Sequence, residues 1–120
     1  MSDSTPVLHL VPRSQWSTAQ QLAPASLASE GFVHCSPDDD VTLAVANAFY
    51  AGAERPLLVL TIDPSRCGAP LVWEAADPAP PPGVADDTLF PHLYGPVPPD
   101  AVVAVRTVEW DAEGTAVRIG

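Results

Sequence analysis

Two apolar runs, residues 7–11 and 57–62, give the clearest pattern in the chain, and both predict β-strands. Each run is apolar on both faces, which is typical of strands inside a sheet rather than at its edge. His9 interrupts the first run. A buried imidazole there must either bond to a neighbouring carbonyl or face a cavity, and the pattern leaves both open.

A short strand over residues 31–36 is predicted to lead directly into a helix. Alternation places Phe32, His34 and Ser36 on one face of the strand and Cys35 on the other. The strand therefore delivers an imidazole and a hydroxyl to the N-terminus of a helix, a place suited to polar or anionic small molecules.

The helix itself is expected over residues 37–51, with Ser36 as its N-cap and Gly52 at its end. Asn47 is expected to be solvated or locally bonded. Helical spacing predicts a core-facing stripe made of Val41, Ala44, Val45, Ala48 and Phe49.

The rest of the pattern predicts one more helix and four more strands. The helix is expected over 12–21, followed by a small-residue loop up to Glu30, and the strands over 70–74, 90–96, 101–110 and 115–119. This order predicts an α+β fold in which two helices pack on a single mixed β-sheet.

Length and composition narrow the function. The 120 residues suit a single domain (1–120), with a disordered tail at 1–5 and a proline-rich loop at 76–88. A net charge of −10, with five arginines and no lysine, argues against nucleic-acid partners. No apolar run is long enough to span a membrane, no signal peptide is recognisable, and Cys35 and Cys67 lack metal or redox spacing, so a reduced cytoplasmic protein is expected.

Polar side chains fall in or beside several predicted strands. His34 shares a face with Ser36, His92 shares a face with Tyr94, and Glu74 ends a strand. Together they predict a cleft that binds a small molecule. The histidines also allow a zinc site, although their scattered spacing and the absence of cysteine pairs favour no metal.

Several segments together resemble a bacterial family known as domain of unknown function 952, over roughly residues 6–108. The segments that carry the resemblance are His9-Leu10-Val11, Ser26 to Ser36 (SLASEGFVHCS), Ala46-Asn47-Ala48-Phe49, Leu58 to Pro64 (LVLTIDP), Trp73-Glu74 and Phe90 to Pro96 (FPHLYGP).

The resemblance implies a fold like that of the ADP-ribosyltransferases, in which a bent, split sheet grips NAD. It implies that His9, His34, Ser36, His92 and Tyr94 bind the nucleotide and that Glu74, with His34 and His92, carries any catalysis. The superfamily usually has its aromatic residue before its acid, whereas here Glu74 precedes Tyr94. The expected function is therefore NAD binding with possible NAD cleavage or ADP-ribosyl transfer. The alternatives are a nucleotide or metabolite binding module without turnover and a histidine-based metal-assisted hydrolase.

Overall fold

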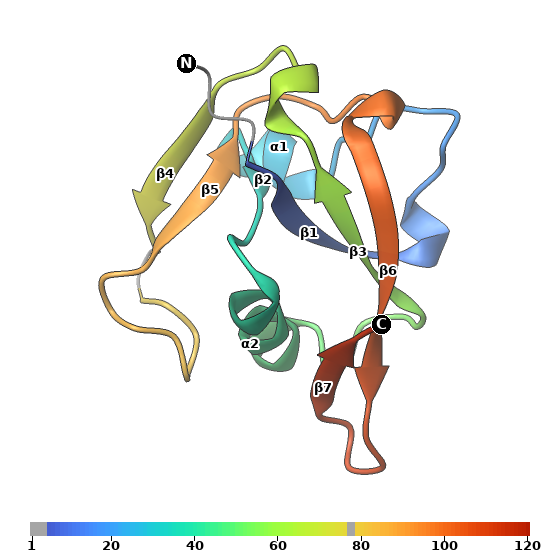
Figure 1. Cartoon of the computed structure of the whole chain (residues 1–120), viewed down its shortest axis with the longest axis vertical. Helices are drawn as coiled ribbons and strands as arrows, with labels where there is room; N and C mark the ends of the chain where they lie inside the picture. The colour runs from blue at the N-terminus through green and yellow to red at the C-terminus, as the bar shows by residue number, and fades with distance from the viewer. Residues whose placement is uncertain (1–4, 77–78) are drawn as a thin grey trace.

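The computed structural model describes residues 5–76 and 79–120 as two antiparallel sheets with two helices (Figure 1). Three short 3-10 helices, Arg13–Gln15, Pro64–Arg66 and Pro99–Ala101, lie in the connections. The strands and helices are β1 (Val7–Pro12), α1 (Ala25–Glu30), β2 (Val33–His34), α2 (Asp39–Phe49), β3 (Leu57–Ile62), β4 (Leu71–Ala75), β5 (Leu89–Leu93), β6 (Val102–Trp110) and β7 (Ala116–Ile119).

The larger sheet has the strand order β1-β3-β6-β7. β3 is central, as its two apolar faces predict, and five of its six residues are buried. β1 stands at the end of this order, yet all six of its residues are buried. Strand β1 is therefore an edge by pairing but is not exposed to solvent.

The smaller sheet has the order β2-β5-β4, so the expectation of a single mixed sheet is wrong. The pairs within each sheet are antiparallel. One isolated bridge joins the sheets, because the backbone N–H of Leu8 donates to Ser36 at 2.9 Å and that of Ser36 donates to Leu8 at 2.7 Å. We call this bridge the seam.

Helix α2 begins two residues later than predicted. Asp38, not Ser36, is the N-cap, and its carboxylate accepts from the backbone N–H of Val41 at 2.9 Å. Ser36 is unavailable as a cap because the seam uses both of its backbone groups. Gly52 does not adopt the left-handed conformation that was expected at the end of the helix.

The buried face of α2 also differs from the predicted stripe. Thr42 and Ala46 are its fully buried residues, whereas Phe49 is 70% exposed. Thr42 can be buried because its hydroxyl donates to the carbonyl of Asp38 at 2.7 Å. Asn47, which was expected to be solvated or locally bonded, instead bonds to a distant strand: its amide donates to the carbonyl of Ala116 in β7 and accepts from the N–H of the same residue.

The other helix lies elsewhere than expected. The segment predicted as a helix at 12–21 contains only the 3-10 turn Arg13–Gln15, and the presumed small-residue loop forms α1. Gly31 ends α1 in the left-handed conformation, at φ 90°. The small residues of α1 thus favour a helix, with glycine as its stop.

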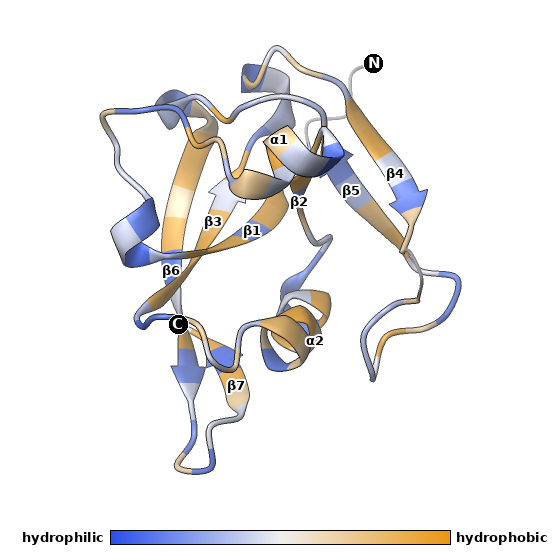
Figure 2. Cartoon of the chain, turned by 180° about the vertical axis from the view of Figure 1, so that it is seen from behind, coloured by the Kyte–Doolittle hydropathy of each residue, from blue (hydrophilic) through white to orange (hydrophobic). Residues whose placement is uncertain are grey.

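The apolar residues form two clusters on opposite faces of the large sheet. One joins β1 and β3 to the small sheet, around Leu60, Ile62 and Leu93; the other packs α2 and β7 against Leu57 and Val59. Figure 2 shows apolar colour along these strands and on part of α2. Side chains alternate along β3, so one face of the strand packs towards α2 and the other towards the small sheet. The large sheet therefore lies between these two layers.

The proline-rich segment expected to be a loop has no helix or strand at residue 76 or at 79–88, and residues 77–78 lie outside the described residues. The tail expected at 1–5 lies outside them too, except for Thr5. No helix in the described ranges is long and apolar enough to cross a membrane.

Candidate functional site

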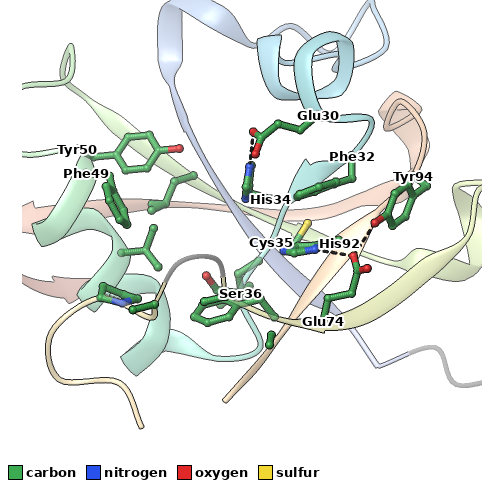
Figure 3. Close-up of a pocket in the computed structure, with 18 residues that line it drawn as sticks. Glu30, Phe32, His34, Cys35, Ser36, Phe49, Tyr50, Glu74, His92 and Tyr94 are labelled. Carbon is green, nitrogen blue, oxygen red and sulfur yellow. Dashed lines mark hydrogen bonds and ion pairs between the residues drawn. The ribbon is translucent and has the colours of Figure 1, made fainter. Parts of the chain in front are cut away.

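A cavity of about 770 Å³ opens between the small sheet, the end of β1 and α2 (Figure 3). Its polar side consists of His34 on β2, Glu74 on β4, His92 on β5 and Tyr94, which directly follows β5. Its other side is apolar and is formed largely by α2 and β1. The volume lies within the range of small-molecule sites in proteins.

Glu74 stands at the centre of the polar side. Its Oε1 atom accepts from the Tyr94 hydroxyl at 2.6 Å and is 2.7 Å from Nδ1 of His92. The hydrogen bond from Tyr94 is the main cause that lowers the pKa of Glu74, and the bond to His92 is the second. The Tyr94–Glu74 bond also raises the pKa of Tyr94. Within the described residues Oε2 has no hydrogen-bond partner, so one ionised oxygen is free to meet a ligand.

The cross-strand register brings these groups together. His92 pairs with His34 on β2 and with Val72 on β4, so Glu74, two residues after Val72, is its diagonal neighbour. Phe90, His92 and Tyr94 line the pocket from one stretch of alternating chain.

Aromatic rings surround the two imidazoles. Phe32 stacks on His92 with ring centroids 4.0 Å apart and planes at 19°, and it meets His34 edge-on at 4.8 Å. The Tyr94 ring lies 5.4 Å from that of Phe32. The His34 and His92 centroids are 5.6 Å apart, so one ligand can reach both.

His34 has a carboxylate partner of its own. Its Nε2 lies 2.9 Å from Glu30 at the end of α1, and both side chains are about half exposed. The residues predicted for the cleft, His34, Ser36, His92 and Tyr94, thus meet in one pocket with Glu74.

The structure does not bring His9 to that pocket. Its side chain is buried in β1, and Nδ1 donates to the carbonyl of His34 at 2.7 Å. Burial is the main cause that lowers the pKa of His9, so this imidazole stays neutral. His9 is a core histidine bonded to a neighbouring carbonyl, and it supports the strand that carries His34.

Ser36 and Cys35 differ in their surroundings. Ser36 lines the pocket although it is only 5% exposed. Cys35 borders the pocket but packs in the core cluster, and burial raises the pKa of its thiol. Both cysteines are free and buried.

The charged residues that line the pocket are acidic. Glu30 and Glu74 line it, whereas none of the five arginines does so, and the chain has no lysine. The described residues also contain no group of three His, Cys, Asp or Glu side chains able to hold a metal ion.

The family model "Protein of unknown function (DUF952)" matches residues 10–105. The chain belongs to the DUF952 family. Its match includes all of the polar residues of the pocket, from Glu30 to Tyr94. No curated protein matches the sequence.

Solved structures of another protein share the fold of this DUF952 protein. The crystal structure of CC0527 from Caulobacter crescentus is 23% identical, with a TM-score of 0.63 and 94% of each chain covered. The solution NMR structure of CC0527 is 26% identical, with a TM-score of 0.66, and covers 93% of this chain and 91% of that one.

Some pocket residues of this DUF952 protein were not recognised from the sequence. The sequence pattern predicts Glu30 at the end of a loop and Phe49 in the core stripe of the second helix, whereas both residues line the pocket. Phe32 was correctly placed on the face of His34, and that alternation was the available signal for its stacking role. No local pattern reveals Glu30 as a partner of His34, because the contact depends on the turn at Gly31.

Proposed function

We propose that the pocket binds NAD, or a closely related nucleotide, by its nicotinamide-riboside end and promotes cleavage of the bond between ring and ribose. One observation carries the proposal: a carboxylate with a lowered pKa, Glu74, stands among aromatic rings with one oxygen free. The pocket thus offers a negative charge to the ribose and flat faces to the ring.

This arrangement suits the charge that the reaction develops. In NAD the ribose C1′ is bonded to the nitrogen of a positively charged nicotinamide ring. When this bond breaks, its electron pair stays with the nitrogen and nicotinamide leaves as a neutral molecule. Glu74 stabilises the positive charge that gathers on the ribose as the bond breaks. His34, exposed at the pocket, is placed to accept the proton lost by water or another acceptor when its oxygen bonds to C1′.

The resemblance to ADP-ribosyltransferases supports the same proposal. Two sheets joined at the seam are compatible with a split sheet around a nucleotide. The reversed order of acid and aromatic residue is also less of an obstacle in space, because Glu74 and Tyr94 are bonded to each other.

The second candidate is a binding module without turnover, and the charge of the pocket favours it. A diphosphate is normally held by arginine, lysine or a helix N-terminus, and no arginine lines the described part of this pocket. An uncharged or cationic metabolite would need no such group.

The test is incubation with NAD, with released nicotinamide measured by chromatography and binding measured by calorimetry. We expect Glu74→Gln to lower the release rate by about 100-fold, the size of losing one transition-state charge partner. Glu113→Gln is the matched control, because Glu113 lies in the exposed turn between β6 and β7, outside the pocket. Binding without release would identify the binding module. If NAD neither binds nor releases nicotinamide, the NAD proposal is refuted, and the remaining candidate is a module that binds a metabolite without a diphosphate.

A further inference from the structure

The pocket continues beyond Glu74 into an apolar recess beside α2. We call it the α2 recess and define it by the lining residues that come from β1 and from the C-terminal half of α2 with its C-cap, namely Leu8, Leu10, Val45, Phe49 and Tyr50. Figure 3 shows Phe49 and Tyr50 on the side of the pocket away from Glu74 and Tyr94. The carboxylates Glu30 and Glu74 belong to the polar side, so the recess carries no formal charge.

Phe49 is exposed in a way that packing does not explain. At 70% exposure it exceeds every other large apolar side chain of the described ranges. It projects from the last turn of α2 at the pocket, while the buried face of the helix is formed by Thr42 and Ala46. A large ring held in this position is available to stack on a ligand.

Ser36 gives an independent indication of a ligand. The residue is only 5% exposed, it lines the pocket, and its hydroxyl bonds to no described residue. Among the described residues, Trp110 Nε1 is the side-chain atom that is both fully buried and without a hydrogen-bond partner. The unpaired Ser36 hydroxyl does not share this state, so it retains some access to solvent. A hydroxyl on a nearly buried residue that lines the pocket offers a hydrogen bond to a ligand that binds there.

Size and polarity indicate what fits. A cavity of about 770 Å³ exceeds the room that a single ring and sugar need at the polar side. The recess offers flat aromatic faces from Phe49 and Tyr50, a hydroxyl from Ser36, and no charge. A flat, uncharged heteroaromatic ring with nitrogen acceptors matches all three features.

We propose that the α2 recess is a second subsite that binds a purine ring, stacked on Phe49 and hydrogen-bonded by the Ser36 hydroxyl. The inference deepens the proposed function and rests on it in one respect: the two subsites then hold the two ends of one dinucleotide. The recess itself can be tested with a ligand that never reaches Glu74.

Adenosine is that probe. In NMR titrations we expect adenosine to shift the signals of Ser36, Val45 and Phe49 more than those of Glu30 and Tyr94. Phe49→Ala should weaken adenosine binding about tenfold, the usual effect of losing one stacking partner. The melting temperature should hardly change, because the ring is exposed.

Val117→Ala is the matched control, because Val117 is 53% exposed on β7 and lies outside the pocket. It should leave adenosine binding unchanged. Ser36→Ala should also weaken binding, and nicotinamide mononucleotide, which lacks the purine, should bind the wild type and Phe49→Ala equally well.

The outcomes separate the two proposals. Adenosine that shifts recess signals while NAD is neither bound nor cleaved would retain the subsite and reject the proposed function. If NAD is cleaved and Phe49→Ala leaves the affinity for NAD unchanged, the proposed function is retained and the subsite is overturned. Adenosine that leaves the recess signals unshifted would also overturn the subsite.

Discussion

Single residues set the charge of the pocket through shared hydrogen bonds. Tyr94 and His92 both meet the same oxygen of Glu74, so two neutral or positive groups stabilise one carboxylate. The carboxylate is thereby ionised over a wider range of pH than a free glutamate, while its second oxygen stays available.

Replacing Tyr94 by Phe tests this arrangement. The ring and its stacking remain, but the strongest bond to Glu74 is lost, so the pKa of Glu74 should rise towards its ordinary value. In the wild type this pKa is lower folded than unfolded, so the stabilisation is present above the unfolded pKa and is lost as pH falls through the folded one. Tyr94→Phe should therefore lose less stability on acidification.

Carbon-13 NMR titration of the Glu74 carboxyl and urea unfolding at several pH values provide the measurements. An unchanged Glu74 pKa in Tyr94→Phe would show that His92 alone sets it.

Two adjacent residues of the central segment are expected to respond differently to substitution. His34 faces the pocket with its side chain about half exposed, whereas Cys35 packs in the core. His34→Ala should lower ligand affinity by about 1–2 kcal/mol with little effect on melting, since it removes one hydrogen bond to the ligand. Cys35→Ser should lower stability, because it buries a hydroxyl among apolar side chains.

Calorimetry with NAD and thermal melts on both variants decide the matter. Normal binding by His34→Ala, together with a stable Cys35→Ser variant that no longer binds, would reverse the assignment of these two side chains.

Among the elements, the side chain of Asn47 links α2 to β7 of the β6–β7 hairpin. The Asn47 amide bonds to both backbone groups of Ala116, at 3.1 and 2.8 Å, and takes the place that a further strand would occupy there. Ala116 is buried, so these backbone groups have little access to water.

Asn47→Leu should therefore destabilise the protein by about 1–3 kcal/mol, the cost of leaving buried backbone groups unpaired. Asn47→Asp is the informative comparison, because it keeps the acceptor for the N–H of Ala116 but loses the donor. Urea unfolding and hydrogen exchange at the Ala116 amide measure both. Equal stability of wild type and Asn47→Leu would show that water replaces the amide without cost.

The errors in element assignment share a cause, which is tertiary pairing that local sequence does not contain. Ser36 is a good N-cap by type, but its backbone is paired with Leu8, so the cap moves to Asp38. Strands were predicted well wherever apolar runs were long, as at β3 and β6. The single sheet was wrong because alternation within a strand does not say which strands pair.

Across the whole molecule, the acidic excess is the dominant electrostatic feature. With fifteen acidic residues and five arginines, the folded chain repels itself at neutral pH. Raising sodium chloride from about 0.01 to 0.15 M shortens the screening length from about 30 to 8 Å and should raise the melting temperature. Calorimetric melts check this, and a falling melting temperature would mean that ion pairs such as Arg106–Asp39 outweigh the repulsion.

Much of the candidate site was foreseeable, because it depends on alternation. His34 and Ser36 follow from one alternating stretch, and His92 and Tyr94 from another. For His9 the sequence allows either a bond to a neighbouring carbonyl or a position facing a cavity, and the structure shows the first. Glu30 and Phe49 join the pocket only through the turn at Gly31 and the rotation of α2, which no sequence period encodes.

The seam between Leu8 and Ser36 connects the two sheets beside the pocket. The two backbone bonds of the seam join the sheets together with the apolar cluster around Leu60 and Leu93, and the His9 ring adds a hydrogen bond to the carbonyl of His34. The pocket lies in the angle between the sheets, with Leu8 on one wall and His92 on the other. A ligand that touches both walls therefore links the two sheets across the pocket, and its contacts add to the cohesion between them.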